Sequence, residues 1–142
     1  MAHLVRDVMT KQALALSPDA TLFEAARLMR DRDIGNVLVV AADRVLGILT
    51  DRDIAVRAVA MGRDPYRTPL RAVCTPDVRT VRPDQDTAEA SRLMRSAMVR
   101  RLAVVEEDGR VRGVITLGDV ARADEPRSAL ADISAAPPNN GA

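Results

Sequence analysis

The chain has 142 residues, of which 47% are apolar and 29% charged, which suits one compact domain or two very small ones. Its 21 basic and 20 acidic residues nearly cancel, and aromatic residues make up only 1%, so a general nucleic-acid-binding protein is disfavoured. The uncharged runs are too short to cross a bilayer, and the opening residues contain no apolar run of signal-peptide length. We therefore expect a cytoplasmic protein without a membrane partner.

An internal repeat organises the sequence. Residues 17–40 align with residues 82–105, and both copies contain an identical Arg-Leu-Met-Arg block. Further along the chain, Gly47 aligns with Gly113 and Asp53 with Asp119. A copy of about 55–60 residues can bury only a marginal core by itself, so we expect the two copies to pack against each other.

The first copy is predicted to be a β-α-β-β-α unit that starts with an extended piece over residues 13–16. Thr21 and Glu24 fit a capping box at the start of the first helix. The apolar stripe of that helix comprises Leu22, Ala25, Ala26 and Met29. A hairpin over residues 37–40 and 45–49 precedes a second helix over residues 51–61, with Gly62 suited to its C-cap.

The second copy predicts the same order of elements. It has an extended piece over residues 78–82, a helix capped by Asp86 with Glu89, a hairpin over residues 102–105 and 111–115, and a helix from about Leu117. The expected domains are residues 7–65 and 73–123, joined by a linker over residues 66–72. Residues 124–142 lack a sustained apolar period and are expected to form a flexible tail.

The repeat resembles a tandem pair of CBS domains, also called a Bateman module. The helix starts, the apolar hairpins and the duplicated segment Gly-h-h-Thr-x-x-Asp, where h is apolar, carry this resemblance over most of the chain. It implies an α/β (α+β) fold of two β-α-β-β-α repeats packed with pseudo-two-fold symmetry. It also implies a non-catalytic regulatory module, forming a homodimer, whose clefts bind AMP, ADP or ATP, or alternatively NAD or S-adenosylmethionine.

The resemblance also implies which residues line the two clefts. One cleft would be formed by Thr50, Asp53, Val78, Val99 and Arg100, with Arg101 as the alternative to Arg100. The other would be formed by Thr116, Asp119, Ala13, Ile34 and Gly35. A carboxylate can accept hydrogen bonds from both hydroxyls of a ribose, and an arginine can contact a phosphate. Because the first copy has Gly35 where the second has Arg100, we expect the Asp53 cleft to bind phosphorylated ligands better than the Asp119 cleft.

Each of these residues also has a purely structural interpretation. Thr50 and Asp53 fit an N-cap with an acidic first turn, and this role is compatible with ligand binding. Arg100 and Arg101 fit a solvated surface pair. The methionines of the first helices (Met29, Met94 and Met98) fit core or interface packing, and Cys74 occupies an ordinary apolar position.

Two other functions compete with ligand sensing. A structural or partner-binding protein could use the same fold without a physiological nucleotide. An enzyme is disfavoured because the chain has one His, one Cys and no P-loop or nucleophile–base pattern. The same scarcity of His and Cys predicts no metal site and no catalytic cofactor. The downstream protein partner stays open.

Overall fold

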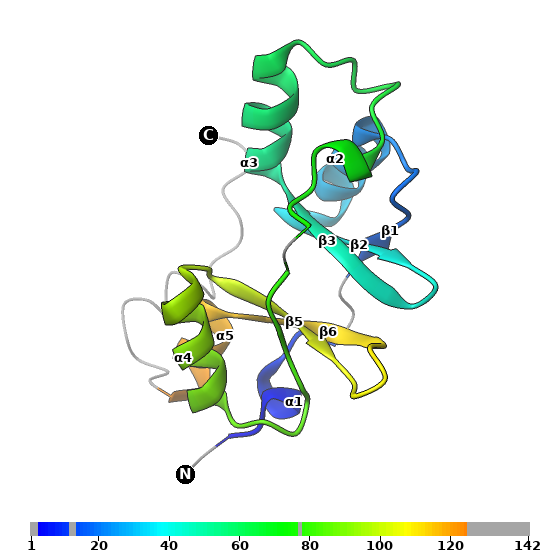
Figure 1. The fold of residues 1–142 in the computed structure, drawn as a ribbon. Helices are drawn as coiled ribbons and strands as arrows, with labels where there is room; N and C mark the ends of the chain where they lie inside the picture. The colour runs from blue at the N-terminus through cyan, green and yellow to red at the C-terminus, as the bar shows by residue number, and fades with distance from the viewer. Residues whose placement is uncertain (1–2, 12–13, 77, 125–142) are drawn as a thin grey trace. The chain divides into compact units, whose positions relative to one another are not determined.

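The computed structural model describes residues 3–11, 14–76 and 78–124, which form two compact units (Figure 1). The first-sheet unit comprises Leu14–Val78. The second-sheet unit combines the described residues before Leu14 with those from Arg79 onward. None of the helices within the described ranges has the length and apolar character required to span a membrane.

The first-sheet unit confirms the predicted order of elements. Its three strands are β1 (Ala15–Leu16), β2 (Asn36–Ala41) and β3 (Arg44–Thr50), with β2 parallel to β1 and antiparallel to β3. Helix α2 (Leu22–Arg32) connects β1 to β2. After β3 the chain forms α3 (Asp51–Asp53), a π-helical turn η1 (Ile54–Ala58) and a 3₁₀ turn η2 (Val59–Met61). The predicted second helix is therefore present, although its hydrogen-bond pattern changes twice along its length.

The second-sheet unit repeats this arrangement. Its elements are β4 (Thr80–Val81), α4 (Thr87–Ala97), β5 (Arg101–Val105), β6 (Val111–Thr116) and α5 (Leu117–Asp124), and its strand order is β4-β5-β6. β4 pairs with β5 in parallel, and β5 pairs with β6 antiparallel. Asp124, the first residue of the predicted tail, is the last residue of α5, and the rest of that tail lies outside the described residues.

Local sequence signals determine where the first helix of each unit begins. Glu24 donates its backbone N–H to Thr21 Oγ1 at 3.2 Å, and Glu24 Oε2 accepts from the Thr21 N–H at 3.3 Å. In α4, Asp86 Oδ1 accepts from the Glu89 N–H at 3.1 Å. These bonds satisfy amides that have no partner inside the helix, so both predicted caps are confirmed. Gly62 ends η2 with a φ of 72°, as expected for a glycine C-cap.

The apolar stripes of α2 and α4 form the two cores, with two exceptions to the prediction. Met29 and Met94 are buried as expected, whereas Ala26 is exposed. Met98 is 89% exposed, so of its two predicted roles the core one is wrong and the interface one stays a prediction. The helix ends at Ala97 and Met98 adopts a left-handed conformation with φ 58°, which removes its side chain from the helical stripe.

Each core also contains a segment that precedes the other repeat in the sequence. Leu70 and Val73 are buried in the first-sheet core, although the sequence assigned them to a linker and to the second domain. Val5 and Met9 are buried in the second-sheet core, and Figure 1 shows α1 (Val5–Val8) beside β5 and β6. The compact units thus differ from the predicted domain boundaries. Both segments have similar apolar patterns, so the pattern alone could not assign either segment to one sheet.

A glycine on the last strand of each sheet lets the backbone of these segments approach the strand closely. Thr75 pairs with Ile48 of β3, and a Cβ on the adjacent Gly47 would lie 2.8 Å from the Thr75 carbonyl oxygen. Thr10 pairs with Val114 of β6 in the same way, and a Cβ on Gly113 would lie 2.3 Å from the Thr10 carbonyl oxygen. Both distances are below ordinary contact, so only glycine allows the backbones to approach this closely.

We predict that Gly113→Ala destabilises the protein by about 1–3 kcal/mol, because the added methyl overlaps the Thr10 backbone and forces it off the strand. Gly35→Ala is the matched control. Its added Cβ would lie 3.1 Å from the end of the exposed Asp51 side chain, which can move aside. Urea unfolding of both variants measures the difference. A similar loss of stability in both would show that the close approach at Gly113 does not constrain the fold.

Candidate functional site

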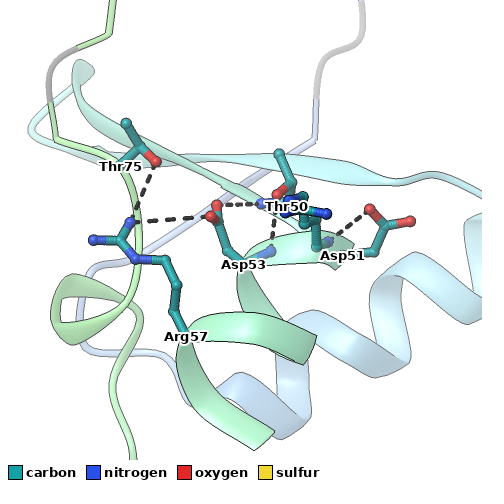
Figure 2. Close-up of polar contacts among 6 residues, drawn as sticks. Thr50, Asp51, Asp53, Arg57 and Thr75 are labelled. Atoms are coloured by element: carbon teal, nitrogen blue, oxygen red, sulfur yellow. Dashed lines mark hydrogen bonds and ion pairs between the residues drawn. The ribbon is translucent and has the colours of Figure 1, made fainter. Parts of the chain in front are cut away.

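The end of β3 places Thr50 and Asp53 in a reciprocal cap at the start of α3 (Figure 2). Asp53 donates its N–H to Thr50 Oγ1 at 3.0 Å, and Asp53 Oδ2 accepts from the Thr50 N–H at 3.0 Å. The Asp53 side chain is only 14% exposed. Its other oxygen, Oδ1, lies 4.0 Å from Arg57 Nη1, which is a long ion pair.

The end of β6 places Thr116 and Asp119 in the same geometry. Asp119 donates to Thr116 Oγ1 at 3.0 Å, and Asp119 Oδ2 accepts from the Thr116 N–H at 2.9 Å. The Asp119 side chain is 6% exposed, and its Oδ1 forms an ion pair with Arg122. The structural interpretation of both Thr-x-x-Asp segments as caps is therefore confirmed. Because each cap uses only one carboxylate oxygen, the other oxygen can take a different partner.

The residues just before β2 and β5 lie beside these caps within their own units. The Gly35 carbonyl accepts from the Asp51 N–H at 3.0 Å, and the Arg100 carbonyl accepts from the Leu117 N–H at 2.8 Å. Ile34 packs against the first-sheet core and Val99 against the second-sheet core. Each unit therefore brings its own Thr-x-x-Asp segment next to residues that the sequence had assigned to the other cleft.

The remaining predicted site residues are located as follows. Arg100 is exposed, Arg101 is half-buried at the start of β5, and Val78 is half-buried at the end of the first-sheet unit. Ala13 lies outside the described residues. Two clefts that each combine residues of both units stay a prediction.

A groove of about 470 Å³ lies between the end of α4 and the start of α5. It is lined by Ser91, Met94, Arg95, Met98, Val99, Arg100 and Leu117, all from the second-sheet unit. Its walls combine apolar side chains with two arginines. The corresponding place in the first-sheet unit differs in charge, because Gly35 lies beside the Asp51 carboxylate instead. The second-sheet unit therefore has positively charged side chains at this place, whereas the first-sheet unit has a negatively charged one.

Three side chains near the carboxylates were not predicted from the sequence. Arg57 and Arg122 follow Asp53 and Asp119 by four and three residues, a helical spacing that could have indicated both ion pairs. Thr75 accepts a hydrogen bond from Arg57 Nη1 at 3.4 Å. It is distant in sequence from the other residues of the cluster, and no local signal indicates this contact.

Cys74 lies next to this cluster, and its ionisation depends on it. Burial raises the pKa of the Cys74 thiol above its ordinary value, and the negative charge of Asp53 raises it further. A backbone hydrogen bond and the positive charge of Arg57 act in the opposite direction on the same pKa. The pKa of the Cys74 thiol therefore depends on the charges of both Asp53 and Arg57.

No cluster of three His, Cys, Asp or Glu side chains suited to a metal ion occurs among the residues that the structure describes. The geometry instead presents, in each unit, one largely buried carboxylate held at a helix start. Two β-α-β-β-α units with this feature define a tandem-repeat α/β module.

The chain belongs to the CBS domain family, whose model matches residues 5–59 and 70–125. The CBS domain-containing protein YhcV of Bacillus subtilis is 40% identical over 117 residues, which cover 82% of each chain. Hypoxic response protein 1 of Mycobacterium tuberculosis is 33% identical over 118 residues, again 82% of each chain. The chain is thus a CBS pair, a module of regulatory type.

Solved structures agree with this assignment. A crystal structure of hypoxic response protein I with two coordinated zinc ions is 31% identical, with a TM-score of 0.76 over 84% of this chain and 98% of that chain. PAE2072 from Pyrobaculum aerophilum, complexed with AMP, is 24% identical with a TM-score of 0.75 over 82% and 89%. The MJ0100 CBS pair, complexed with 5′-methylthioadenosine and S-adenosylmethionine, is 23% identical with a TM-score of 0.79 over 90% and 100%. At these identities, the last two comparisons show the fold alone.

We predict that Asp53→Asn increases the rate at which Cys74 is alkylated at pH 8. Removal of the negative charge lowers the thiol pKa, so a larger fraction is present as reactive thiolate. Asp51→Asn, on the exposed side of the same helix start, is the control. The pH dependence of iodoacetamide labelling measures the change. An unaltered pH profile in Asp53→Asn would contradict the placement of this carboxylate near the thiol.

Proposed function

We propose that this CBS pair is a non-catalytic sensor of adenosine-containing ligands, with AMP, ADP and ATP as the first candidates and NAD and S-adenosylmethionine as further ones. One observation carries the proposal. Asp53 and Asp119 are both largely buried, and each carboxylate keeps one oxygen outside its helix cap. The AMP and S-adenosylmethionine complexes of PAE2072 and MJ0100 are consistent with it at the level of the fold.

The chemistry of the site suits a nucleoside. Adjacent ribose hydroxyls can donate to the free oxygen of a carboxylate, and this bond is strengthened by the negative charge of the acceptor. Aliphatic side chains such as Val99 and Ile34 can cover the faces of an adenine ring, so the low aromatic content is no obstacle. Arg100 is exposed, and a guanidinium is well suited to contact a phosphate.

The two carboxylates are unequally available. Asp53 Oδ1 has only the 4.0 Å contact with Arg57, whereas Asp119 Oδ1 is held in a close ion pair by Arg122. A ligand at Asp119 would have to displace that arginine first. This difference supports the expectation that Asp53 binds the ligand more tightly than Asp119.

In this proposal, ligand binding shifts the protein between two conformations, and a protein partner recognises one of them. A ligand can shift such an equilibrium only by binding one conformation more tightly than the other. No step of this function requires a catalytic residue or a catalytic cofactor.

We also propose that the protein forms a homodimer through helical surfaces. Three apolar side chains of the segment after Asp53 are exposed: Val56 by 47%, Val59 by 66% and Met61 by 71%. Met98 in the second-sheet unit is exposed by 89%. Exposed apolar side chains that are close in sequence are typical of a protein–protein contact, and two-fold dimers are the commonest assembly.

For the sensing function we predict that Asp53→Asn weakens AMP binding about tenfold or more, because a charge-assisted hydrogen bond to the ligand is lost. Asparagine can still accept the cap hydrogen bond from the Thr50 N–H, so the fold should be retained. Asp119→Asn should weaken AMP binding less. Isothermal titration calorimetry with AMP measures both affinities, and urea unfolding checks stability.

Three outcomes decide between the alternatives. Equal losses in both variants would contradict the inequality of the two sites. Full AMP affinity in both variants would show that the carboxylates do not bind the ligand. If none of the five candidate ligands binds or raises the melting temperature of the unaltered protein, a structural or partner-binding role without a nucleotide is favoured.

For the homodimer we predict that Val59→Asp shifts the protein from dimer to monomer, because a charge would be buried in the contact. Arg44→Asp is the control, because Arg44 is an exposed residue of β3, outside the proposed contact. Sedimentation velocity measures the mass of each variant. A monomeric unaltered protein would refute the dimer.

A further inference from the structure

Arg57 connects the carboxylate of Asp53 to the chain segment that leads into the second repeat (Figure 2). Its Nη1 lies 4.0 Å from Asp53 Oδ1 and donates to Thr75 Oγ1 at 3.4 Å. Both contacts are long, and the Arg57 side chain is 49% exposed. One nitrogen serves both partners, so a movement of the guanidinium changes its contacts with Asp53 and Thr75 together.

Thr75 is fixed mainly through its backbone. Its N–H donates to the Ile48 carbonyl at 2.9 Å, and its carbonyl accepts from the Ile48 N–H at 3.0 Å. This contact is possible because Gly47 has no Cβ, which would otherwise overlap the Thr75 carbonyl oxygen. Apart from residue 77, the described chain continues through Pro76 and Val78 toward β4 of the second-sheet unit. Among the described residues, Thr75 is therefore the last whose backbone pairs with a strand of the first sheet before the chain enters the second repeat.

The second repeat lacks this three-residue link. Thr10 crosses β6 as Thr75 crosses β3, but the position that corresponds to Arg57 is occupied by Ala123. Arg122 pairs with Asp119, and no hydrogen bond joins it to Thr10 in the described part of the chain. The link is thus a property of the Asp53 side only.

We propose that Arg57 is a positioning residue that couples ligand binding at Asp53 to the backbone pairing of Thr75 with Ile48 of the first sheet. The inference rests on the proposed adenosine-ligand function and specifies how one site acts on the connecting segment. When ribose hydroxyls occupy Asp53 Oδ1, the guanidinium loses its carboxylate partner and turns to the ligand phosphate. Thr75 then loses its side-chain contact, and the bridge to Ile48 opens more often.

The weakness of the two contacts favours such an exchange. An ion pair at 4.0 Å and a single hydrogen bond at 3.4 Å hold the half-exposed guanidinium only loosely. A phosphate offers two charge-assisted hydrogen bonds in the geometry that a guanidinium prefers. A phosphorylated adenosine ligand can therefore compete for Arg57, whereas adenosine without a phosphate provides only the ribose hydroxyls.

Amide hydrogen exchange tests the coupling, with AMP as the probe. The rates at the Ile48 and Thr75 amides are divided by the rate at Val39, a buried residue of β2, to remove any general stabilisation. In the unaltered protein, AMP should accelerate this normalised exchange about two- to fivefold, as expected for the loss of a weak exposed contact. In Arg57→Ala the exchange should already be faster by the same factor without AMP, and AMP should not change it.

Matched variants separate coupling from a general structural effect. Thr75→Val removes the hydroxyl and should abolish the response to AMP, whereas Thr75→Ser keeps the hydroxyl and should retain it. Arg52→Ala removes an exposed arginine from the same helical segment and should behave like the unaltered protein. If Arg52→Ala alters the exchange as much as Arg57→Ala does, the coupling is refuted.

The design also separates failure of the coupling from failure of the proposed function. If AMP binds by calorimetry but leaves the normalised exchange unchanged or slows it, the coupling is wrong and the sensing function stands. If AMP does not bind the unaltered protein, both AMP sensing and its coupling to Thr75 are refuted. The ligand-free comparison of Arg57→Ala with Arg52→Ala then still shows whether Arg57 holds Thr75.

Discussion

The close approach of a chain segment to a glycine on the last strand of each sheet is the constraint on which the structure depends. Thr75 crosses β3 at Gly47, and Thr10 crosses β6 at Gly113. The Thr75 crossing brings Leu70 into the first-sheet core, and the Thr10 crossing brings Val5 into the second-sheet core. A single β-α-β-β-α repeat is too small to complete such a core by itself. The first of these crossings also places Thr75 within reach of Arg57, and so links the candidate site to the connection between the repeats.

The Thr-x-x-Asp segments combine a helix cap with a carboxylate that is a candidate for ligand binding. The cap fixes the first turn of the helix and, in doing so, fixes one oxygen of a largely buried carboxylate. The second oxygen is held less firmly at Asp53 than at Asp119, because Arg57 is more distant than Arg122. Two copies of one sequence pattern therefore provide two carboxylates in different chemical surroundings.

Most secondary structure and the site carboxylates could be predicted from short-range patterns. The caps at Thr21 and Asp86, the hairpins and the helix starts after Thr50 and Thr116 each depend on residues that are close in sequence. Predictions failed where a backbone angle or a distant segment decided the outcome. Met98 left the apolar stripe because the helix ended one residue earlier, and the contact of Arg57 with Thr75 had no local signal.

The sequence by itself determined the duplicated β-α-β-β-α order, the helix caps and the membership of the CBS domain family, because these depend on spacing and residue type within each copy. Only the tertiary structure decided which core receives the segments before each repeat. Val5 and Met9 have the same apolar character as Leu70 and Cys74, so either pair could be buried by either sheet. The choice depends on backbone hydrogen bonds between residues distant in the chain, such as those of Thr10 with Val114 and Thr75 with Ile48, which no local pattern encodes.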